Sequence, residues 1–217
     1  MTDLTQWPTS RFDVDIAGQT WTLERIADLE TLWDAMDDDE GDEHIPYWVE
    51  LWPASLTLAT WIIEHQKKLQ GKTCLDLGCG MGLTAIIASS IGARVAAIDY
   101  EWPALFFAQK NGLINKVTSP LWLQMDWCHH GFKPGIFDVI WGGDILYEQR
   151  FFGPISSMFA TVLAPGGRIL LSTPERSVSR PVWGHFIRLG WKVEQLVDTR
   201  ETIESMDMPI KLMQLTR

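Results

Sequence analysis

Hydrophobic and polar residues alternate in two short stretches near the N-terminus. Residues 12–16 place apolar side chains at every second position, and a similar spacing resumes in residues 21–26. Alternation with a period of two is typical of strands that bury one face, and Ala17 and Gly18 between the stretches can form a turn. The pattern therefore predicts a β-hairpin that caps the rest of the chain.

Further along, compact apolar runs alternate with segments in which apolar residues recur at helical spacing. The predicted buried strands cover residues 73–77, 93–99, 120–125, 137–141 and 168–172. The predicted helices cover residues 28–36, 56–69, 83–91, 102–113, 152–163 and 182–189. Strands that alternate with helices usually pair in parallel, so we expect one open α/β sheet. Two closing strands, residues 191–197 and 210–215, are expected to form an antiparallel pair at one edge.

Length and composition limit the class of protein. The chain has 217 residues, of which 46% are apolar, and it contains no apolar run of membrane length. We expect an N-terminal extension (residues 1–45) followed by one α/β domain (residues 46–217). The first residues lack the features of a signal peptide, which favours a cytoplasmic protein without membrane contact. Three cysteines at irregular spacing match neither a zinc site nor a disulfide framework.

Charge is unevenly distributed along the chain. The net charge is −10, and residues 26–66 contain eleven Asp and Glu but no Lys or Arg. Seven of these acidic residues lie between Asp34 and Glu43. An acidic balance disfavours a nucleic-acid partner, because phosphate neutralisation supplies much of the affinity for nucleic acids. The acidic segment is either a solvated loop or a surface for a basic partner.

A glycine turn follows the first buried strand of the α/β region. Gly78, Gly80 and Gly82 let a ligand approach the backbone closely, because they carry no Cβ atom. The dinucleotide fingerprint needs its third glycine at position 83, where this chain has Leu83. Asp76 within the strand would repel a pyrophosphate but attract the ammonium group of S-adenosylmethionine. The spacing therefore favours S-adenosylmethionine over NAD, and the alternative is a glycine-rich turn without a ligand.

The ends of the next two strands carry polar and aromatic residues. Asp99 closes the second strand, where a carboxylate can meet ribose hydroxyls, and Tyr100 is expected beside the adenine. Asp126 and Trp127 follow the third strand and are expected to bind the adenine amino group and cover its ring. Residues 128–130 read Cys-His-His, but neighbouring side chains rarely converge on one ion, so we predict no metal site.

Two further segments are expected at the same edge of the sheet. Gly143 precedes Asp144 at the end of the fourth strand, and Tyr147 lies three residues further on. Open α/β sheets bind ligands at the carboxyl ends of their strands, which makes both side chains candidates for the site. Upstream of the glycine turn, Trp52 either covers a ligand or packs against the sheet, and Glu50 is a candidate hydrogen-bonding residue.

These segments together resemble a known enzyme family. The string from Leu75 to Gly82, Asp99, Asp126-Trp127 and residues 143–147 are similar to class I S-adenosylmethionine-dependent methyltransferases. The Trp-Pro pair at positions 52–53 and the Asp-x-x-Tyr motif of Asp144 and Tyr147 resemble family 16, particularly the electron-transfer-flavoprotein β-subunit lysine methyltransferases. The resemblance implies a Rossmann-like, doubly wound sheet of seven mostly parallel strands.

The resemblance also implies a reaction and its acceptor. We expect S-adenosylmethionine-dependent N-methylation of lysine in a protein substrate, with Asp144 fixing the amine and Tyr147 forming the wall of its channel. A direct displacement of this kind needs no enzyme nucleophile, and catalysis comes from orientation and exclusion of water. One alternative is a small-molecule N-methyltransferase similar to nicotinamide N-methyltransferase. Another is a non-catalytic scaffold, which would predict an eroded glycine turn or loss of Asp99.

Overall fold

The computed structural model describes residues 7–28, 32 and 46–217. The acidic segment from Asp34 to Glu43 and most of the helix predicted for residues 28–36 lie outside the described residues. None of the helices in the described ranges is long and apolar enough to cross a membrane.

The predicted N-terminal hairpin is confirmed. Strands β1 (Thr9–Ile16) and β2 (Gln19–Ile26) pair in antiparallel register and form a two-stranded sheet of their own. Ala17 and Gly18 form the turn with φ of 51° and 78°, and Asp15 Oδ1 accepts the Gly18 amide at 3.0 Å. The alternating apolar side chains enter the main hydrophobic core through Val14, Ile16, Trp21 and Leu23.

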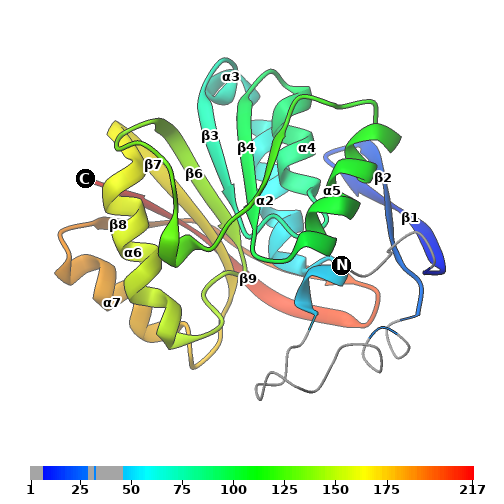
Figure 1. Ribbon diagram of the computed structural model, residues 1–217. Coiled ribbons are helices and arrows are strands. Elements are labelled where there is room, and N and C mark those ends of the chain that lie inside the picture. Colours follow the sequence, from blue (N-terminus) through cyan, green and yellow to red (C-terminus); the bar gives the residue numbers. More distant parts are fainter. Residues whose placement is uncertain (1–6, 29–31, 33–45) are drawn as a thin grey trace.

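A seven-stranded sheet forms the centre of the molecule, in the order β5-β4-β3-β6-β7-β9-β8 (Figure 1). Its strands are β3 (Thr73–Leu77), β4 (Arg94–Asp99), β5 (Leu121–Gln124), β6 (Phe137–Gly143), β7 (Leu163–Pro174), β8 (Lys192–Ile203) and β9 (Met206–Thr216). The first five run parallel, and β9 runs antiparallel to both β7 and β8. This confirms the predicted edge pair, although β8 and β9 are longer than their apolar patterns indicated.

Helices cover both faces of this sheet. The helices are α2 (Pro53–Glu64), α3 (Gln66–Leu69), α4 (Leu83–Ser90), α5 (Trp102–Ile114), α6 (Phe152–Val162) and α7 (Arg180–Arg188). Helices α2, α4 and α5 lie on one face, and α6 and α7 lie on the other (Figure 1). The helix predicted for residues 56–69 is interrupted at His65, whose ring stacks on Trp61 with centroids 4.1 Å apart. The doubly wound architecture is therefore confirmed.

Strand order changes direction between β3 and β6, since the chain adds β4 on one side of β3 and later adds β6 on the other. In open α/β sheets the two helical connections diverge at such a point and leave a crevice beyond the carboxyl ends of the strands. The glycine turn after β3 and the segment after β6 both open into this crevice.

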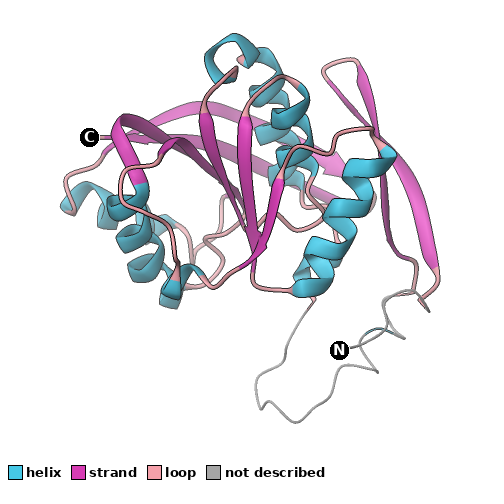
Figure 2. Cartoon of the chain, turned by 45° about the horizontal axis from the view of Figure 1, so that its top comes forward, coloured by secondary structure: helices cyan, strands magenta, loops and turns pink. Residues whose placement is uncertain are grey.

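Two asparagine side chains of α5 fasten the hairpin to the domain. Asn111 accepts the Glu24 amide at 2.7 Å and donates to the Glu24 carbonyl at 3.2 Å. Asn115 accepts the Thr22 amide at 3.1 Å and donates to its carbonyl at 2.7 Å. One helical turn separates the two asparagines, so they match the two-residue repeat of one strand edge. Figure 2 shows the hairpin beside a helix of the domain, α5. Asn111 also donates to the Met81 carbonyl in the glycine turn, at 3.1 Å.

We expect Asn111→Ala to lower the free energy of unfolding by about 2–4 kcal/mol, because it leaves buried groups of Glu24 and Met81 without partners. Asn115→Ala is the matched control, since this side chain is only partly buried, and its loss should be about 1 kcal/mol. Urea unfolding followed by tryptophan fluorescence measures both values. An equal or smaller loss for Asn111→Ala would contradict its role as the main anchor of the hairpin.

Candidate active site

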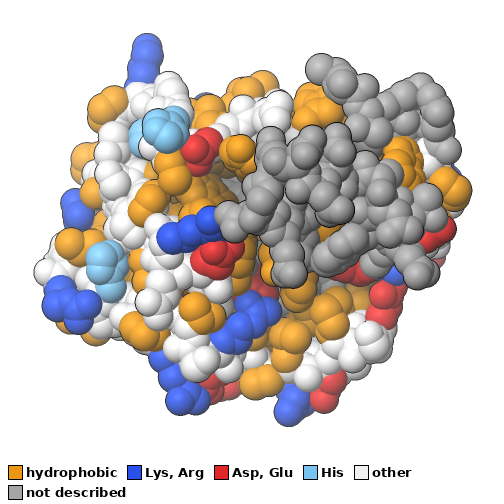
Figure 3. Space-filling model, turned by 60° about the horizontal axis from the view of Figure 1, so that its bottom comes forward, with side chains coloured by type: hydrophobic (Ala, Val, Ile, Leu, Met, Phe, Trp, Pro, Cys, Tyr) orange, Lys and Arg blue, Asp and Glu red, His pale blue; other side chains and the backbone are white. Residues whose placement is uncertain are grey.

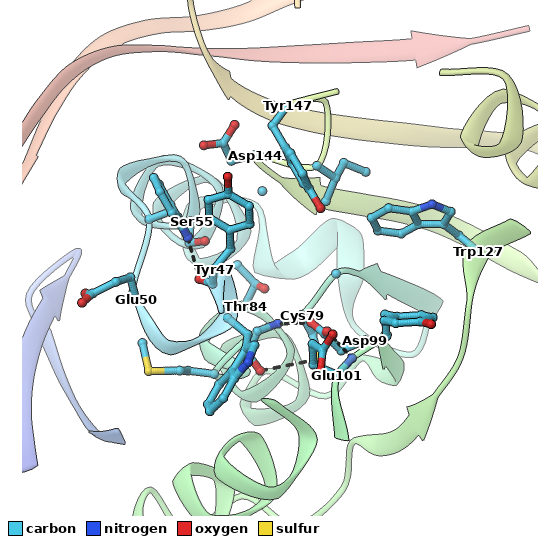
Figure 4. Close-up of a pocket in the computed structure, with 18 of the residues that line it drawn as sticks. Tyr47, Glu50, Ser55, Cys79, Thr84, Asp99, Glu101, Trp127, Asp144 and Tyr147 are labelled. Atoms are coloured by element: carbon cyan, nitrogen blue, oxygen red, sulfur yellow. Dashed lines mark hydrogen bonds between the residues drawn. The ribbon is translucent and has the colours of Figure 1, made fainter. Parts of the chain in front are cut away.

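A cavity of about 490 Å³ lies beyond the carboxyl ends of β3, β4 and β6, at the predicted crevice (Figure 4). Residues from the segment before α2 and from the loops after β3, β4, β5 and β6 line it. The predicted site residues among its lining are Trp52, Gly78, Gly80, Gly82, Asp99, Tyr100, Asp126, Trp127, Gly143, Asp144 and Tyr147. Asp76 is the one predicted site residue that does not line it.

The glycine turn forms the floor of this cavity. Gly78, Gly80 and Gly82 have φ of 67°, 49° and 85°, in the left-handed region that side chains disfavour. A Cβ atom at Gly82 would lie 2.8 Å from both Ala108 Cβ and Trp122 Cη2, so α5 and β5 require glycine there. Among the described residues, the neighbour that a Cβ atom at Gly80 would meet within 4 Å is the Trp48 carbonyl oxygen, at 3.8 Å. Space for a ligand therefore remains above Gly80.

Asp99 connects the glycine turn to the end of β4. Its Oδ2 accepts the Gly80 amide at 2.8 Å, and its Oδ1 accepts the Glu101 amide at 3.0 Å. Burial raises the pKa of Asp99 to about 6, although these backbone hydrogen bonds oppose the shift. Each carboxylate oxygen can accept a second hydrogen bond, so Asp99 keeps acceptor capacity for hydroxyl groups of a ligand.

Asp126 and Trp127, which follow β5, form another part of the cavity lining. Asp126 accepts the Cys128 amide at 2.8 Å and contacts His129 Nδ1 at 2.9 Å, which caps the short 3₁₀ helix Trp127–His129. Burial alone would raise the pKa of Asp126. The hydrogen bonds from Cys128 and His129 have the larger combined effect, so this pKa lies below its ordinary value. Trp127 packs edge-on against Phe151, with centroids 5.1 Å apart. Contact of this pair with adenine stays a prediction.

Asp76 lies beneath the glycine turn, where it is only 1% exposed. Its Oδ2 accepts the Thr84 hydroxyl at 2.5 Å, and burial raises its pKa to about 6 even though Thr84 opposes the shift. Thr84 belongs to the first turn of α4 and lines the cavity in its place. Asp76 is therefore buried outside the cavity lining, and its contact with a ligand's ammonium group stays a prediction. Its short side chain points into the fold and supports the turn from below.

Glu50 also differs from expectation. Its carboxylate forms an ion pair with Arg25 of β2 at 2.5 Å, and Arg25 also binds Glu204 in the β8–β9 turn at 2.5 Å. Figure 4 shows the Glu50 side chain directed away from the centre of the cavity. Although Glu50 contributes to the lining, its carboxylate joins three distant segments of the chain instead of facing the space above the glycine turn.

Asp144 lies at the end of the cavity away from the glycine turn. The sequence analysis did not predict its partner, Arg176. Its φ is 55°, its amide donates to the Ser172 carbonyl at 2.7 Å, and it is 8% exposed. Arg176 donates to both carboxylate oxygens, from Nη1 at 2.6 Å and Nη2 at 2.8 Å. Burial raises the pKa of Asp144 to about 6, against the opposing effect of Arg176. No described helix begins at Asp144, so this side chain does not cap a helix.

Aromatic rings surround this end of the cavity. Tyr47 contacts Trp52 and Tyr147, with centroids 5.9 Å and 5.4 Å away, and Tyr147 contacts Phe151 at 5.5 Å. Trp52 Nε1 donates to the Tyr47 carbonyl at 2.9 Å, which fixes its ring in the lining. Burial raises the pKa of Tyr147 to about 12, so its phenol is neutral at physiological pH.

Close packing of α2 explains why position 143 is a glycine. A Cβ atom there would lie 3.0 Å from Ser55 Oγ and 3.6 Å from Ser55 Cα. The first turn of α2 therefore packs directly on the end of β6, which brings Trp52 beside Asp144. Trp48 is buried and stacks on Phe107 of α5, with ring centroids 6.0 Å apart. Among the described residues, no three His, Cys, Asp or Glu side chains are grouped to hold a metal ion.

Comparison with known proteins identifies the family. Residues 38–187 match the family model described as lysine methyltransferase. The chain belongs to this family. Its cofactor is S-adenosylmethionine, and the resemblance drawn from the glycine turn and the Asp-x-x-Tyr motif is confirmed.

Several proteins with known names are similar to this family member. The mouse histone-arginine methyltransferase METTL23 is 29% identical over 126 residues, which cover 55% of this chain and 48% of that protein. A Paraburkholderia xenovorans ubiquinone biosynthesis O-methyltransferase is 32% identical over 156 residues, covering 72% and 63%. A Dictyostelium discoideum histidine protein methyltransferase 1 homolog is 28% identical over 129 residues, covering 57% and 42%. The chain spans about half the length of these curated relatives.

Solved structures share the fold at low identity. The T. thermophilus 16S rRNA N2 G1207 methyltransferase, in complex with AdoMet and guanosine, has a TM-score of 0.65 at 18% identity. The match covers 95% of this chain and 50% of that chain. A magnesium protoporphyrin IX methyltransferase from Synechocystis with bound SAM has a TM-score of 0.56 at 19% identity, covering 74% and 77%. These matches confirm the Rossmann-like methyltransferase fold.

The cavity fits the cofactor of the family. Its volume of about 490 Å³ suits a nucleoside-sized ligand, Asp99 retains acceptor capacity for ribose hydroxyls, and the space above Gly80 is open. Asp99 and the glycine turn would hold the nucleoside part, and the aromatic end beside Asp144 would receive the acceptor.

Three buried carboxylates should give the ligand-free protein an unusual pH dependence. Asp76, Asp99 and Asp144 each have a pKa of about 6, above the ordinary value of about 3.9. A raised folded-state pKa means that the folded protein holds more protons than the unfolded chain between about pH 4 and 6. Their contribution to stability therefore increases as the pH falls from 7.5 to 5.5. We expect a higher melting temperature at pH 5.5, measured by differential scanning fluorimetry.

Cofactor affinity should change in the opposite direction. Ribose hydroxyls donate hydrogen bonds best to an ionised Asp99, so the affinity for S-adenosylhomocysteine should fall severalfold between pH 7.5 and 5.5. Calorimetry at both pH values measures this change. The Asp99→Asn variant should bind S-adenosylhomocysteine more weakly, and its affinity should no longer depend on pH. The Asp126→Asn variant should keep the pH dependence, because the pKa of Asp126 is lowered in the unaltered protein. A pH-independent affinity of the unaltered protein would argue against an Asp99 contact.

Proposed function

We propose that the chain is an S-adenosylmethionine-dependent methyltransferase that modifies lysine side chains of a protein. The observation that carries this proposal is the single cavity that joins the glycine turn and Asp99 to an aromatic end containing Asp144 and Tyr147. When bound, S-adenosylmethionine supplies a methyl group on a positively charged sulfur, and a neutral amine nitrogen takes it with its lone pair as the carbon–sulfur bond breaks. The remaining argument concerns what the chain's residues do for the amine.

The acceptor end is suited to a side chain that arrives from outside. Tyr47 lines the cavity and is 42% exposed, so this end reaches the protein surface. Tyr100, at the cofactor side of the same cavity, is 62% exposed. Figure 3 shows a hollow with apolar side chains in it and charged side chains around it. Exposed aromatic rings beside a hollow are typical of surfaces that contact another protein, and this favours a protein acceptor over a fully enclosed small molecule.

The aromatic walls favour the reactive form of lysine. Removing an ammonium group from water lowers its pKa from the unperturbed value of about 10.4 and so increases the neutral fraction. Tyr47, Trp52 and Tyr147 supply rings that can desolvate the amine. The oxygens of Asp144 can accept a hydrogen bond from its N–H and so orient the lone pair. Orientation of this kind accounts for a large part of catalysis in direct displacements.

The acceptor class can be tested by labelling. The protein is incubated with radiolabelled S-adenosylmethionine and a cell extract, and the label is traced to small molecules or to macromolecules. We expect label in protein, and mass spectrometry of digested protein should place the methyl groups on lysine. Label in small molecules would support the small-molecule alternative. Label on arginine or histidine would contradict lysine specificity, and these are the residues that the names of two relatives specify.

Asp144 can be tested with the same assay. Asp144→Asn keeps the shape of the side chain but weakens its hydrogen-bond acceptance, so turnover should fall more than tenfold with cofactor affinity nearly unchanged. Asp198→Asn, the same change at an exposed carboxylate of β8, is the control and should be neutral. Calorimetry and the labelling rate per folded molecule separate the two effects. Normal turnover of Asp144→Asn would remove Asp144 from the mechanism.

A further inference from the structure

The ion pair between Asp144 and Arg176 is the one feature of the acceptor end that the function above leaves unexplained. Both carboxylate oxygens of Asp144 are bound by the same guanidinium, at 2.6 and 2.8 Å. The Asp144 side chain is 6% exposed, whereas that of Arg176 is 31% exposed. Arg176 Cζ also lies 5.9 Å from the centroid of the Trp52 ring. The guanidinium therefore lies between the carboxylate and an aromatic wall of the cavity.

An unpaired carboxylate would have an unwanted effect at this position. A buried negative charge within a few ångströms of an amine stabilises the ammonium form and raises its pKa, often by one to three units. The ammonium form has no lone pair to give, so such a site would bind the acceptor tightly in an unreactive state. A carboxylate already neutralised by a guanidinium still has lone pairs that can accept an N–H.

We propose that Arg176 is a positioning residue that sets the protonation state of the acceptor, because its pairing with Asp144 lets this carboxylate orient a neutral amine without trapping the ammonium. This inference rests on the proposed function, since it concerns an amine acceptor. Arg176 acts through Asp144 and is not itself assigned a contact with the reacting atoms.

The loop between β7 and α7 is built to hold Arg176 in place. Ser179 is 3% exposed, and its single hydroxyl proton is shared between the carbonyl oxygens of Pro174 and Arg176, which lie 3.3 and 3.1 Å from its Oγ. The Arg176 amide donates to Ser179 Oγ at 3.3 Å. The neighbouring Glu175 points elsewhere and pairs with Lys211 of β9 at 3.2 Å. These contacts fix the backbone on both sides of Arg176, so its side chain needs no further ordering when an acceptor enters.

Among the described residues, the other charged side chains that line the cavity are Glu50, Asp99, Glu101, Asp126, Glu148 and Arg150. Glu148 pairs with Arg150 at 2.6 Å, next to the 3₁₀ helix Gln149–Phe151. Tyr47 and Tyr147 present phenol rings, and Asp99 lies across the cavity, where two backbone amides bind it. Arg176 is the charged group that contacts Asp144 among the described residues. Removing its charge should therefore change the field at the acceptor directly.

Three variants separate charge from structure. Arg176→Gln removes the positive charge, and Arg176→Lys keeps it without the two-pronged geometry. The double variant Asp144→Asn with Arg176→Gln removes both charges and leaves an amide pair. Melting temperatures of all three establish the fraction of folded protein. A loss of stability in Arg176→Gln can then be distinguished from an effect of this variant on the protonation of the amine.

The first measurement does not depend on methylation. Protein loaded with S-adenosylhomocysteine is titrated at pH 7.5 with n-butylammonium, which imitates a lysine side chain. We expect Arg176→Gln to bind this cation at least severalfold more tightly than the unaltered protein. The double variant and Arg176→Lys should show no such gain. Equal binding by Arg176→Gln and the unaltered protein would overturn the inference.

The second measurement uses a synthetic peptide that spans the lysine labelled in the extract. At saturating peptide and cofactor, the rising limb of kcat against pH reports the ionisation of the bound complex. Arg176→Gln should move this limb upward by about one pH unit or more, with a lower KM. The double variant should return the limb to its original position, and Arg176→Lys should stay near it.

The outcomes distinguish this inference from the proposed function. If the unaltered protein methylates lysine but the limb of Arg176→Gln does not move, Arg176 has only a structural role and the inference is wrong. A limb for Arg176→Lys that matches Arg176→Gln would also overturn it, because the charge would then be irrelevant. If no lysine is labelled, the proposed function is wrong, and n-butylammonium binding still decides whether Arg176 shields Asp144.

Discussion

The left-handed glycine turn after β3 is the constraint on which the rest of the site depends. Three glycines with positive φ within five positions bring the chain from the sheet into α4 with no Cβ atom at Gly78, Gly80 or Gly82. The Gly80 amide binds Asp99, and the Met81 carbonyl receives Asn111. Gly82 permits α5 and β5 to pack closely. The turn therefore sets the distance between the cofactor floor, the carboxylate beyond β4 and the helix that holds the hairpin.

Much of the architecture follows from local patterns in the sequence. Apolar runs and helical spacing predicted every strand of the sheet. The glycine spacing predicted at which edge of the sheet the cavity lies. These features are local because period and turn chemistry act over a few residues. The lengths of β8 and β9 were not predicted, since the added residues of β8 are mostly polar and residues 206–209 of β9 pair only with β8. The domain boundary at residue 45 remains a prediction, although hairpin residues share the main core.

The side-chain partners at the site were harder to predict. Arg176 lies 32 residues after Asp144, and only the parallel pairing of β6 with β7 brings the two segments together. A signal was present, because a carboxylate predicted at a buried strand end needs a cation or several donors. The place of Asp76 in the strand does not reveal that Thr84, in the first turn of α4, donates a hydrogen bond to its carboxylate. The ion pair of Glu50 was not predicted, because its partner Arg25 lies in the separate hairpin sheet.

The asparagine pair of α5 has a consequence for the behaviour of the protein in concentrated solution. A two-stranded hairpin normally presents unpaired amides and carbonyls along each edge, and such edges recruit strands from other molecules. Asn111 and Asn115 satisfy the outer groups of Thr22 and Glu24 with side-chain amides in place of a third strand. The helix thereby protects this edge of β2 from self-association. The same two residues that attach the hairpin also keep it from acting as a template for aggregation.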